Sequence, residues 1–304
     1  MAASTDTIPG AAATAAGALS DQQLATQLAG LDALDQAAHR QSASLARRAW
    51  RATWPKLAAI GLALFAWQVV VWSGWRPTYV LPGPITVLER FWQDLGEPET
   101  WRAVATTLRR AAVGFALAVA VGVTIGLAVS RFKSLRTAVG SLITGLQTMP
   151  SIAWFPLALL LFRLSEGAIM FVVVIGAAPS IANGLISGID HVPPLLTRAG
   201  RVLGARGLTA YRHVIIPAAL PTFLTGLKQG WAFAWRSLMA GELLVIIANQ
   251  PSIGSRLQFE REFADSAGLM AVMLLILVIG VAVDAIAFST VERTVRRRRG
   301  LAAS

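Results

Sequence analysis

The sequence predicts an all-α polytopic membrane protein with six transmembrane helices, on three observations. Of its 304 residues, 55% are hydrophobic and 14% are charged, whereas soluble domains carry about 25% charged residues. The apolar residues form long blocks, and about 20 apolar residues suffice to cross a bilayer as a helix. The net charge is +11, and the arginines gather at the edges of the blocks, as they do beside membrane spans.

The first forty residues do not predict a secretory signal peptide, because no basic start is followed by an apolar core and a cleavage site. We expect residues 1–45 to form a cytoplasmic tail, with residues 1–22 disordered because they are Ala, Thr, Ser and Gly. Leucines within 23–38 share one helical face. That helix would contact a partner, rest on the bilayer surface, or fray as an isolated helix does.

Residues 46–299 are predicted to form the transmembrane domain, and 300–304 a short C-terminal tail. The first span ends in tryptophans, which favour the membrane interface. The second is rich in Gly and Ala, which let helices approach closely. Prolines interrupt the third and fourth. The six predicted spans cover 57–75, 111–130, 139–162, 167–187, 218–247 and 268–289.

Lysine and arginine counts predict the orientation. With the N-terminus inside, the inner flanks hold 16 basic residues and the outer segments hold eight. This two-to-one bias predicts that both termini are cytoplasmic. Arg109 and Arg110 oppose the bias, because they fall on the outer side.

Residues 76–107 form the longest predicted outer connection. Within it, LPGPITVLERFWQDL predicts a short amphipathic helix that begins at prolines, with Val87, Phe91 and Leu95 on one face. This helix would be an outer lid or interfacial element, or it would only float at the membrane surface.

Residues 193–217, which we name the elbow, form the inner connection between the fourth and fifth spans. Residues 193–203 predict one short helix, which Gly204 and Gly207 break. Thr209 is expected to cap a second short helix. Pro217 and Pro221 would set the entry into the fifth span, where a first helical turn tolerates proline.

The second helix of the elbow would have an apolar side, with Leu208, Tyr211 and Ile215, and a basic side. Such an elbow suits a knob that fits a groove in another protein. The alternative is an interfacial loop whose prolines only start the next helix, since loops more often only connect helices than bind a partner.

The elbow resembles the cytoplasmic motif E-A-A-x3-G-x9-I-x-L-P of transmembrane subunits of binding-protein-dependent ABC importers. Gly204 matches the motif glycine, and Val214, Ile216 and Pro217 fill the I-x-L-P places. The E-A-A places hold Arg198, Ala199 and Gly200, so an Arg replaces the usual Glu. MPSIAWFPLALLLF and AWRSLMAGELL are similar to the sulfonate, nitrate, taurine and bicarbonate branch, and the resemblance covers 76–299.

The resemblance implies a type I ABC importer permease (MetI-like) fold, in which the elbow docks on a separate ATPase. It implies ATP-Mg on two copies of that ATP-binding subunit, an extracytoplasmic substrate-binding protein, and a location in the bacterial plasma membrane. It also implies a second permease chain, with a homodimer as the economical choice and a different permease chain as the alternative. The substrate would be a small anion. The ATPase-coupling residues would be Arg198, Ala199, Gly200, Gly204, Ala205, Arg206, Gly207, Tyr211 and Pro217.

The sequence itself predicts no enzyme. It contains no G-x-x-x-x-G-K-[ST] loop, so this chain is expected to bind no ATP or other cofactor. There are no cysteines, and the three histidines lack metal-ligand spacing. No Ser, Asp and Glu residues cluster as a nucleophilic site. The positive charge lies at membrane flanks, which favours the lipid bilayer over nucleic acid as its partner.

Charged residues inside the predicted spans are candidates for the substrate pathway. Each costs about 2.5–3.5 kcal/mol near the bilayer centre unless it pairs or faces water. Lys228 or Arg236 would give the pathway a positive potential, or Arg236 would pair with Glu242 or Asp284 and only hold helices together. Glu242 and Asp284 would alternatively be proton or sodium sites of an ion-gradient transporter.

Polar and proline residues in the third and fourth spans are the other pathway candidates, because broken helices often line transport routes. A simple packing kink is the alternative for each proline. Trp154 and Trp235 would narrow the route or face lipid. The predicted pathway residues are Pro150, Ser151, Trp154, Ser180, Asn183, Lys228, Arg236 and Glu242.

Overall fold

The computed structural model describes residues 50–51 and 53–298, and these are helical with connecting turns. The chain divides into two units, Met1–Ser73 and Gly74–Ser304. In the first unit, the helix Thr53–Trp72 is long and apolar enough to cross a membrane, and none of it is buried by protein. It matches the predicted first span. The predicted tail helix at 23–38 lies outside the described residues.

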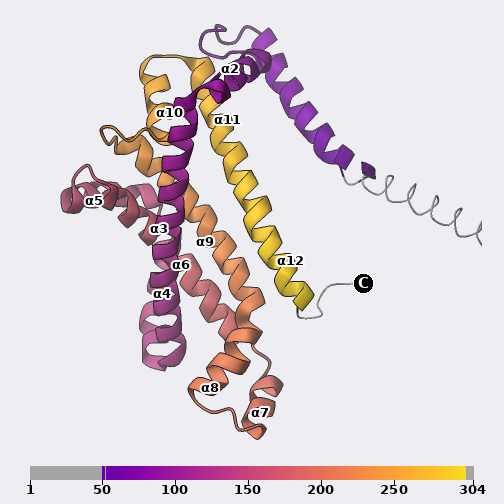
Figure 1. Cartoon of the computed structure of the whole chain (residues 1–304), viewed down its shortest axis with the longest axis vertical. Coiled ribbons are helices and arrows are strands. Elements are labelled where there is room, and N and C mark those ends of the chain that lie inside the picture. Colours follow the sequence, from indigo (N-terminus) through magenta and orange to yellow (C-terminus); the bar gives the residue numbers. More distant parts are fainter. Residues whose placement is uncertain (1–49, 52, 299–304) are drawn as a thin grey trace, which may run out of the picture. The chain divides into compact units, whose positions relative to one another are not determined.

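In the second unit, α2 (Pro84–Gly96), the start of the long helix α3 (Pro98–Arg131) and α10 (Ile253–Glu262) lie toward one end, and the elbow lies at the opposite end (Figure 1). The predicted amphipathic helix is α2. Val87 is buried, and Phe91 and Leu95 pack against a cluster that includes Val104 and Leu275. Because its apolar face has this partner, α2 does not simply float at the surface.

Helix α3 is a single helix of 34 residues, which contains the predicted second span, 111–130, and begins well before it at Pro98. Residues 98–110 belong to this helix and not to an outer loop. Their sequence buries Thr100, Ala103, Thr107 and Arg110 at spacings of three and four, the period of a helix face. The extra turns bring Arg109 and Arg110 into the helix.

The third span is bent, as its prolines predicted. Helix α4 (Lys133–Thr148) ends before Pro150, and the short helix η1 (Ser151–Trp154) leads into α5 (Phe155–Phe162). The two parts meet at 103°. Pro150 has no N–H to continue the helical ladder, so the chain turns there. Helix α5 projects sideways from the long helices (Figure 1).

The centre of the unit is the packing of α6 (Glu166–Asp190) against α9 (Ile216–Leu244) and α3. Gly184 of α6 meets Gly226 of α9 so closely that a Cβ on either would lie 2.5 Å from the other's Cα. Gly122 of α3 similarly accommodates Ile181. Small residues therefore set the helix spacing, as is usual in membranes.

The C-terminal part comprises α11 (Ser266–Val283), the π-helical turn η3 (Asp284–Phe288) and α12 (Ser289–Arg298). Together with Thr53–Trp72, α3 and α6, the stretch Ser266–Val295 is long and apolar enough to span a membrane. The bent pair α4–α5 makes a fifth candidate among the described residues. Helix α9 has the length, 29 residues, but Lys228, Arg236 and Glu242 reduce its hydropathy.

Candidate functional site

Two glycines shape the elbow. Helix α7 (Pro194–Val202) is followed by Gly204 at φ +85° and Gly207 at φ +53°. The Ala205 N–H donates to the Gly200 carbonyl at 2.9 Å and closes the end of α7. Left-handed φ values of this kind suit glycine because a Cβ would clash with the backbone. The elbow therefore turns where the sequence predicted.

The second helix of the elbow differs from the prediction. Gly207, and not Thr209, precedes its first turn, and no side chain caps it. Helix α8 (Leu208–Ala210) runs through the π-helical turn η2 (Tyr211–Ile215) directly into α9. Pro217 lies in the first turn of α9 and Pro221 lies inside it. A force on the elbow therefore acts on the end of a long, continuous helical stretch.

The tip of the elbow is apolar and exposed. Leu208 is 84% exposed, and Val202 and Leu203 are similarly open. A cavity of about 820 Å³ lies beside this tip, and its lining includes Tyr211, Arg201 and Arg206. A cluster of exposed apolar side chains of this kind marks a candidate contact with another protein.

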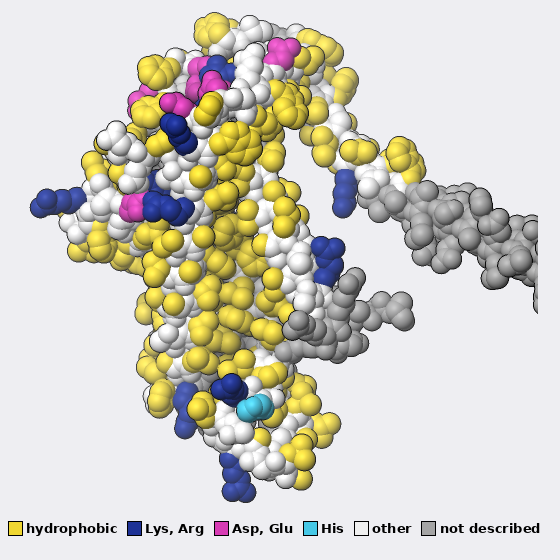
Figure 2. Space-filling view, in the orientation of Figure 1, with side chains coloured by type: hydrophobic (Ala, Val, Ile, Leu, Met, Phe, Trp, Pro, Cys, Tyr) yellow, Lys and Arg dark blue, Asp and Glu magenta, His cyan; other side chains and the backbone are white. Residues whose placement is uncertain are grey.

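The charge of the elbow has one sign. Arg198, Arg201, Arg206 and Arg212 are exposed, and residues 191–241 contain no Asp or Glu. Figure 2 shows Lys, Arg and His side chains at this end and Asp and Glu side chains around α2 and α10. Of the other predicted coupling residues, Ala199 is exposed, Gly200 is buried against Val214, and Pro217 is half-buried.

The predicted pathway residues Pro150, Ser151 and Arg236 line one groove of about 270 Å³, which we name the η1 groove. It lies beside the bend of the third span. Gly176 of α6 and Phe233 of α9 also line it. The structure thus brings together residues from three helical segments. Trp154 packs partly buried against the core, Ser180 is buried, and Asn183 is exposed on α6.

Arg236 does not form the ion pairs that were one alternative. Its Nε donates to the Ala232 carbonyl at 3.1 Å, and its guanidinium lies 4.7 Å from the centre of the Phe233 ring. Glu242 pairs instead with Arg110, and Asp284 pairs with Lys228 at 3.0 Å. Both carboxylates expected for Arg236 are therefore taken by other cations.

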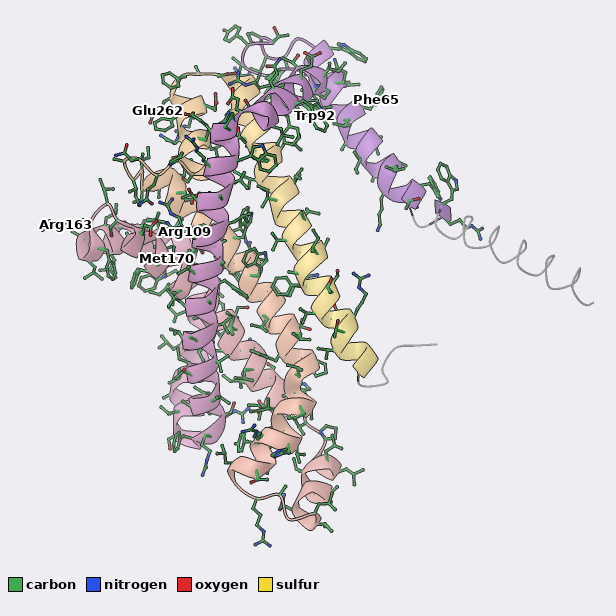
Figure 3. The ribbon with its side chains drawn as sticks, in the orientation of Figure 1. Phe65, Trp92, Arg109, Arg163, Met170 and Glu262 are labelled. Atoms are coloured by element: carbon green, nitrogen blue, oxygen red, sulfur yellow. The ribbon has the colours of Figure 1, made fainter. Side chains whose placement is uncertain are left out.

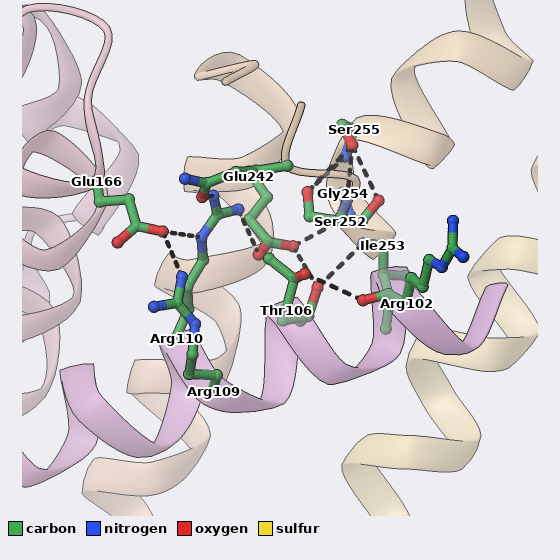
Figure 4. A network of polar contacts seen from close by, with 12 residues as sticks. Arg102, Thr106, Arg109, Arg110, Glu166, Glu242, Ser252, Ile253, Gly254 and Ser255 are labelled. Carbon is green, nitrogen blue, oxygen red and sulfur yellow. Dashed lines mark hydrogen bonds and ion pairs between the residues drawn. The ribbon is translucent and has the colours of Figure 1, made fainter. Parts of the chain in front are cut away.

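Glu242 is fully buried and lies at the centre of a polar network (Figure 4). Arg110, 2% exposed, donates to Oε1 at 3.1 Å. Thr107 donates to Oε2 at 2.8 Å, and the backbone N–H of Gly254 donates to the same oxygen at 3.2 Å. Both oxygens of this buried carboxylate are therefore hydrogen-bonded, as buried polar groups usually are.

The network joins four segments. Arg110 of α3 also donates to Gln250 at 2.8 Å and to Glu166 of α6 at 3.2 Å. Arg109 donates to the same oxygen of Glu166 at 2.7 Å. The sequence raised no functional role for Arg110; its only signal was two arginines on the outer flank, against the charge bias.

The aromatic residues of α9 belong to the core. Trp231 and Trp235 are buried and stack with ring centres 6.2 Å apart, and Phe115 meets Trp231 edge-on at 5.3 Å. Trp235 therefore neither faces lipid nor borders the η1 groove. Arg163, labelled in Figure 3, is exposed at the turn between α5 and α6.

A second polar network fastens α2 to α10 and α11. Arg90 contacts Asp94 at 3.0 Å, Asp265 at 2.8 Å and Glu260 at 3.5 Å. Burial lowers the pKa of Arg90, but the hydrogen bond to Asp94 and the three negative charges outweigh it, so the pKa is raised. Burial raises the pKa of Glu260, which Arg90 only partly offsets.

The described residues contain no group of three or more His, Asp or Glu side chains arranged to hold a metal ion. The described part of the chain thus offers helix packing, ion pairs, an exposed elbow and a groove.

Comparison with known proteins assigns the family. Residues 118–297 match the binding-protein-dependent transport system inner membrane component. The chain belongs to this family. The probable ABC transporter permease protein of Brucella melitensis biotype 1 is 30% identical over 234 residues, which cover 75% of this chain and 94% of that relative. The chain is thus an ABC importer permease, as the elbow motif predicted.

Other relatives confirm the predicted branch. The nitrate import permease protein NrtB of Synechocystis sp. is 30% identical, over 62% of this chain and 70% of that protein. SsuC of Escherichia coli K12, named for aliphatic sulfonate transport, is 29% identical, over 72% of this chain and 82% of its own length.

A solved structure shares the fold. An inward-facing form of the MetNI methionine ABC transporter aligns with a TM-score of 0.57 and 19% identity, over 66% of this chain and 99% of that chain. The expected type I importer permease fold is confirmed by this likeness.

Proposed function

We propose that the chain forms the substrate pathway of an ATP-driven importer and couples to a separate ATPase through residues 193–217. The observation that carries this proposal is the exposed elbow, whose apolar tip lies at the end of a helical stretch that continues through α9. Arg198, Ala199, Gly200, Gly204, Ala205, Arg206, Gly207, Tyr211 and Pro217 form the coupling surface.

ATP hydrolysis belongs to the partner. The sequence has no phosphate-binding loop of the G-x-x-x-x-G-K-[ST] type. In the proposed complex, ATP-Mg binds two copies of the ATPase subunit. Because the elbow exposes four arginines and residues 191–241 contain no acidic residue, we expect the groove that receives the elbow to be acidic. Charge complementarity of this kind sets the encounter rate and selects the partner.

Two permease copies enclose the pathway, and an extracytoplasmic binding protein delivers the substrate. The η1 groove is open on the single chain, and Arg236 is exposed there. An arginine inside a span is costly unless it faces water. A second copy would enclose the grooves in one aqueous route across the bacterial plasma membrane, with both termini in the cytoplasm.

The substrate is a small anion. Two relatives are named for nitrate and aliphatic sulfonates, and Arg236 has no acidic partner among the described residues. Ser151 and Pro150 line the same groove. Lys228 is neutralised by Asp284, so Arg236 is the stronger source of positive potential.

An ion-gradient transporter is the alternative that uses Glu242 and Asp284. A proton or sodium site requires a carboxylate whose oxygens are free to take up the ion. Glu242 is fully buried with three donors, and Asp284 already pairs with Lys228. These contacts favour structural roles for both carboxylates.

The substitution Leu208→Glu tests the coupling role. It places a negative charge on the apolar tip, so we expect at least tenfold weaker binding of the ATPase, because truncations at interface anchors cost about 2 kcal/mol or more. The measurement is co-purification with the partner ATPase, followed by titration of the complex in nanodiscs.

Phe263→Glu is the matched control, because Phe263 is 81% exposed in the turn after α10, away from the elbow. It should leave ATPase binding unchanged. Equal binding of the ATPase to wild-type and Leu208→Glu chains would refute the coupling role.

A further inference from the structure

We propose that the η1 groove is a subsite for a monovalent oxyanion, held by the Arg236 guanidinium and by serine hydroxyls beside Gly176. This inference deepens the proposed function, because it specifies the chemistry that recognises the substrate. It rests on three observations in the part of the chain that the structure describes: an arginine without a counter-ion, a buried hydroxyl without a partner, and a groove lining without carboxylates.

Arg236 is held in place but not neutralised. Its Nε donates to Ala232, and the ring of Phe233 lies against its guanidinium. Within residues 50–51 and 53–298, neither terminal nitrogen, Nη1 nor Nη2, has an acceptor, and no carboxylate lies within ion-pair distance. The two free nitrogens present the fork that binds planar or tetrahedral oxyanions through paired hydrogen bonds.

Ser237 supplies the second observation. Its side chain is 0% exposed, and its Oγ has no hydrogen-bond partner in the described structure. Buried hydroxyls are normally satisfied, so an orphan one calls for an explanation. The Oγ lies 2.4 Å from the point where a Cβ at position 176 would be. Gly176 is a lining residue of the groove, so this hydroxyl lies directly beside it.

Ser151 approaches the same point from η1. Its Cβ lies 3.2 Å from the position that a Cβ on Gly176 would occupy. Glycine at position 176 therefore lets η1, α6 and α9 converge. The Ser237 hydroxyl and the Ser151 side chain, from two segments, therefore meet beside Gly176 at the groove.

The lining decides the class of ligand. It contains one cation, Arg236, and no Asp or Glu, so nothing offsets a positively charged ligand. A volume of about 270 Å³ accommodates a nitrate, a bicarbonate or a sulfonate with a short carbon chain. These ligands share a compact group of oxygens with one negative charge, which matches one guanidinium.

A single-cysteine experiment tests the subsite, because the chain contains no cysteine of its own. Ser151→Cys is introduced into the full chain in nanodiscs, and its modification rate is measured with an anionic and a cationic methanethiosulfonate reagent. We expect the anionic reagent to react faster. Arg236→Gln should lower the anionic-to-cationic rate ratio about tenfold, the effect of removing one nearby charge from a partly aqueous site.

Nitrate and methanesulfonate are the competing probes. Either anion should slow modification of the introduced thiol in the Arg236 chain and should have no effect in Arg236→Gln. Arg236→Lys should keep the rate ratio but weaken the protection, because lysine lacks the paired donors. If Arg236→Gln does not fold, the weaker protection in Arg236→Lys is the test of the subsite. Arg163→Gln, at the exposed turn after α5, should change neither quantity.

The subsite is overturned if Arg236→Gln leaves the anionic-to-cationic rate ratio unchanged. It is also overturned if nitrate and methanesulfonate protect the thiol as well in Arg236→Gln as in the Arg236 chain. The experiment needs no ATPase. Loss of the subsite therefore leaves ATPase coupling standing, and failure of the chain to bind an ATPase leaves the anion measurement intact.

Discussion

At the scale of the residue, Arg110 and Glu242 are the most constrained charges in the described structure. Both are almost completely buried, and each is bound by more than one partner. Two buried charges stabilise a protein only when their geometry is good and their other hydrogen bonds are made. Thr107, Gln250 and Gly254 make those bonds here, so the network fixes where α3, α9 and the start of α10 meet.

Glu242→Ala should destabilise the chain because it leaves Arg110 buried without its main counter-ion. Breaking a buried pair costs about 3–5 kcal/mol, which corresponds to a fall of about 6–15 °C in the unfolding midpoint of a chain this size. Thermal unfolding in nanodiscs, followed by tryptophan fluorescence, measures the change. Replacing both partners, as Arg110→Met with Glu242→Leu, should recover most of the loss. A midpoint for Glu242→Ala indistinguishable from that of wild type would contradict this account.

Residue pairing was the least predictable level. The sequence indicated that charges inside the spans would find partners, but not which ones. Arg236 was a candidate partner for Glu242, but the partner in the structure is Arg110. Helix α3 begins at Pro98, so Arg110 lies within this helix and reaches Glu242 near the end of α9. Such a choice depends on where helices end and how they cross, which periodicity alone does not specify.

At the scale of the element, glycines determine how closely α6 and α9 pack. Gly184 and Gly226 face each other backbone to backbone, and Gly188 faces the Ala219 carbonyl, 2.8 Å from where a Cβ would be. Close backbone approach gives van der Waals contact, which replaces the hydrophobic driving force between helices in lipid. The α6–α9 pair therefore forms a firm base for the η1 groove.

Gly184→Ala should force these helices apart, because the new methyl would lie 2.5 Å from the Gly226 Cα, which cannot rotate away. Overpacking of this kind costs about 1–3 kcal/mol or more. We expect a lower yield of monodisperse protein in size-exclusion chromatography and a lower unfolding midpoint. Gly140→Ala is the control, since nothing lies within 4 Å of its Cβ position on α4. Equal yields for the two variants would argue against tight packing at Gly184.

The order and type of the elements were more predictable than their ends. Apolar blocks located most of the helices, Pro150 located the bend, and Gly204 and Gly207 located the turn of the elbow. The start of α3 was missed because residues 98–110 are polar on one face, although their buried face has helical spacing. The continuous run from α8 into α9 was missed because Pro217 and Pro221 were expected to mark the start of the fifth span, whereas the helical stretch already begins at Leu208 and carries Pro221 in its interior.

At the scale of the whole molecule, the second unit has two functional ends. Acidic and basic groups fasten α2 to α10 and α11 at one end, and a purely basic elbow with an apolar tip lies at the other. Family membership and the exposed elbow support the proposal that this chain transmits conformational changes of a partner ATPase to its own helices. In that account, movement of the elbow shifts α9 and with it Arg236, which lies on the same helix.

The most direct test is the side of the membrane from which the elbow is accessible. In a Leu208→Cys chain, the only cysteine lies at the tip of the elbow. A membrane-impermeant maleimide should label it in inside-out vesicles and not in intact cells, and the bound ATPase should slow that labelling at least tenfold, as expected for an anchor buried at an interface. Labelling from the outside of intact cells, or an unchanged rate with the ATPase bound, would contradict the account.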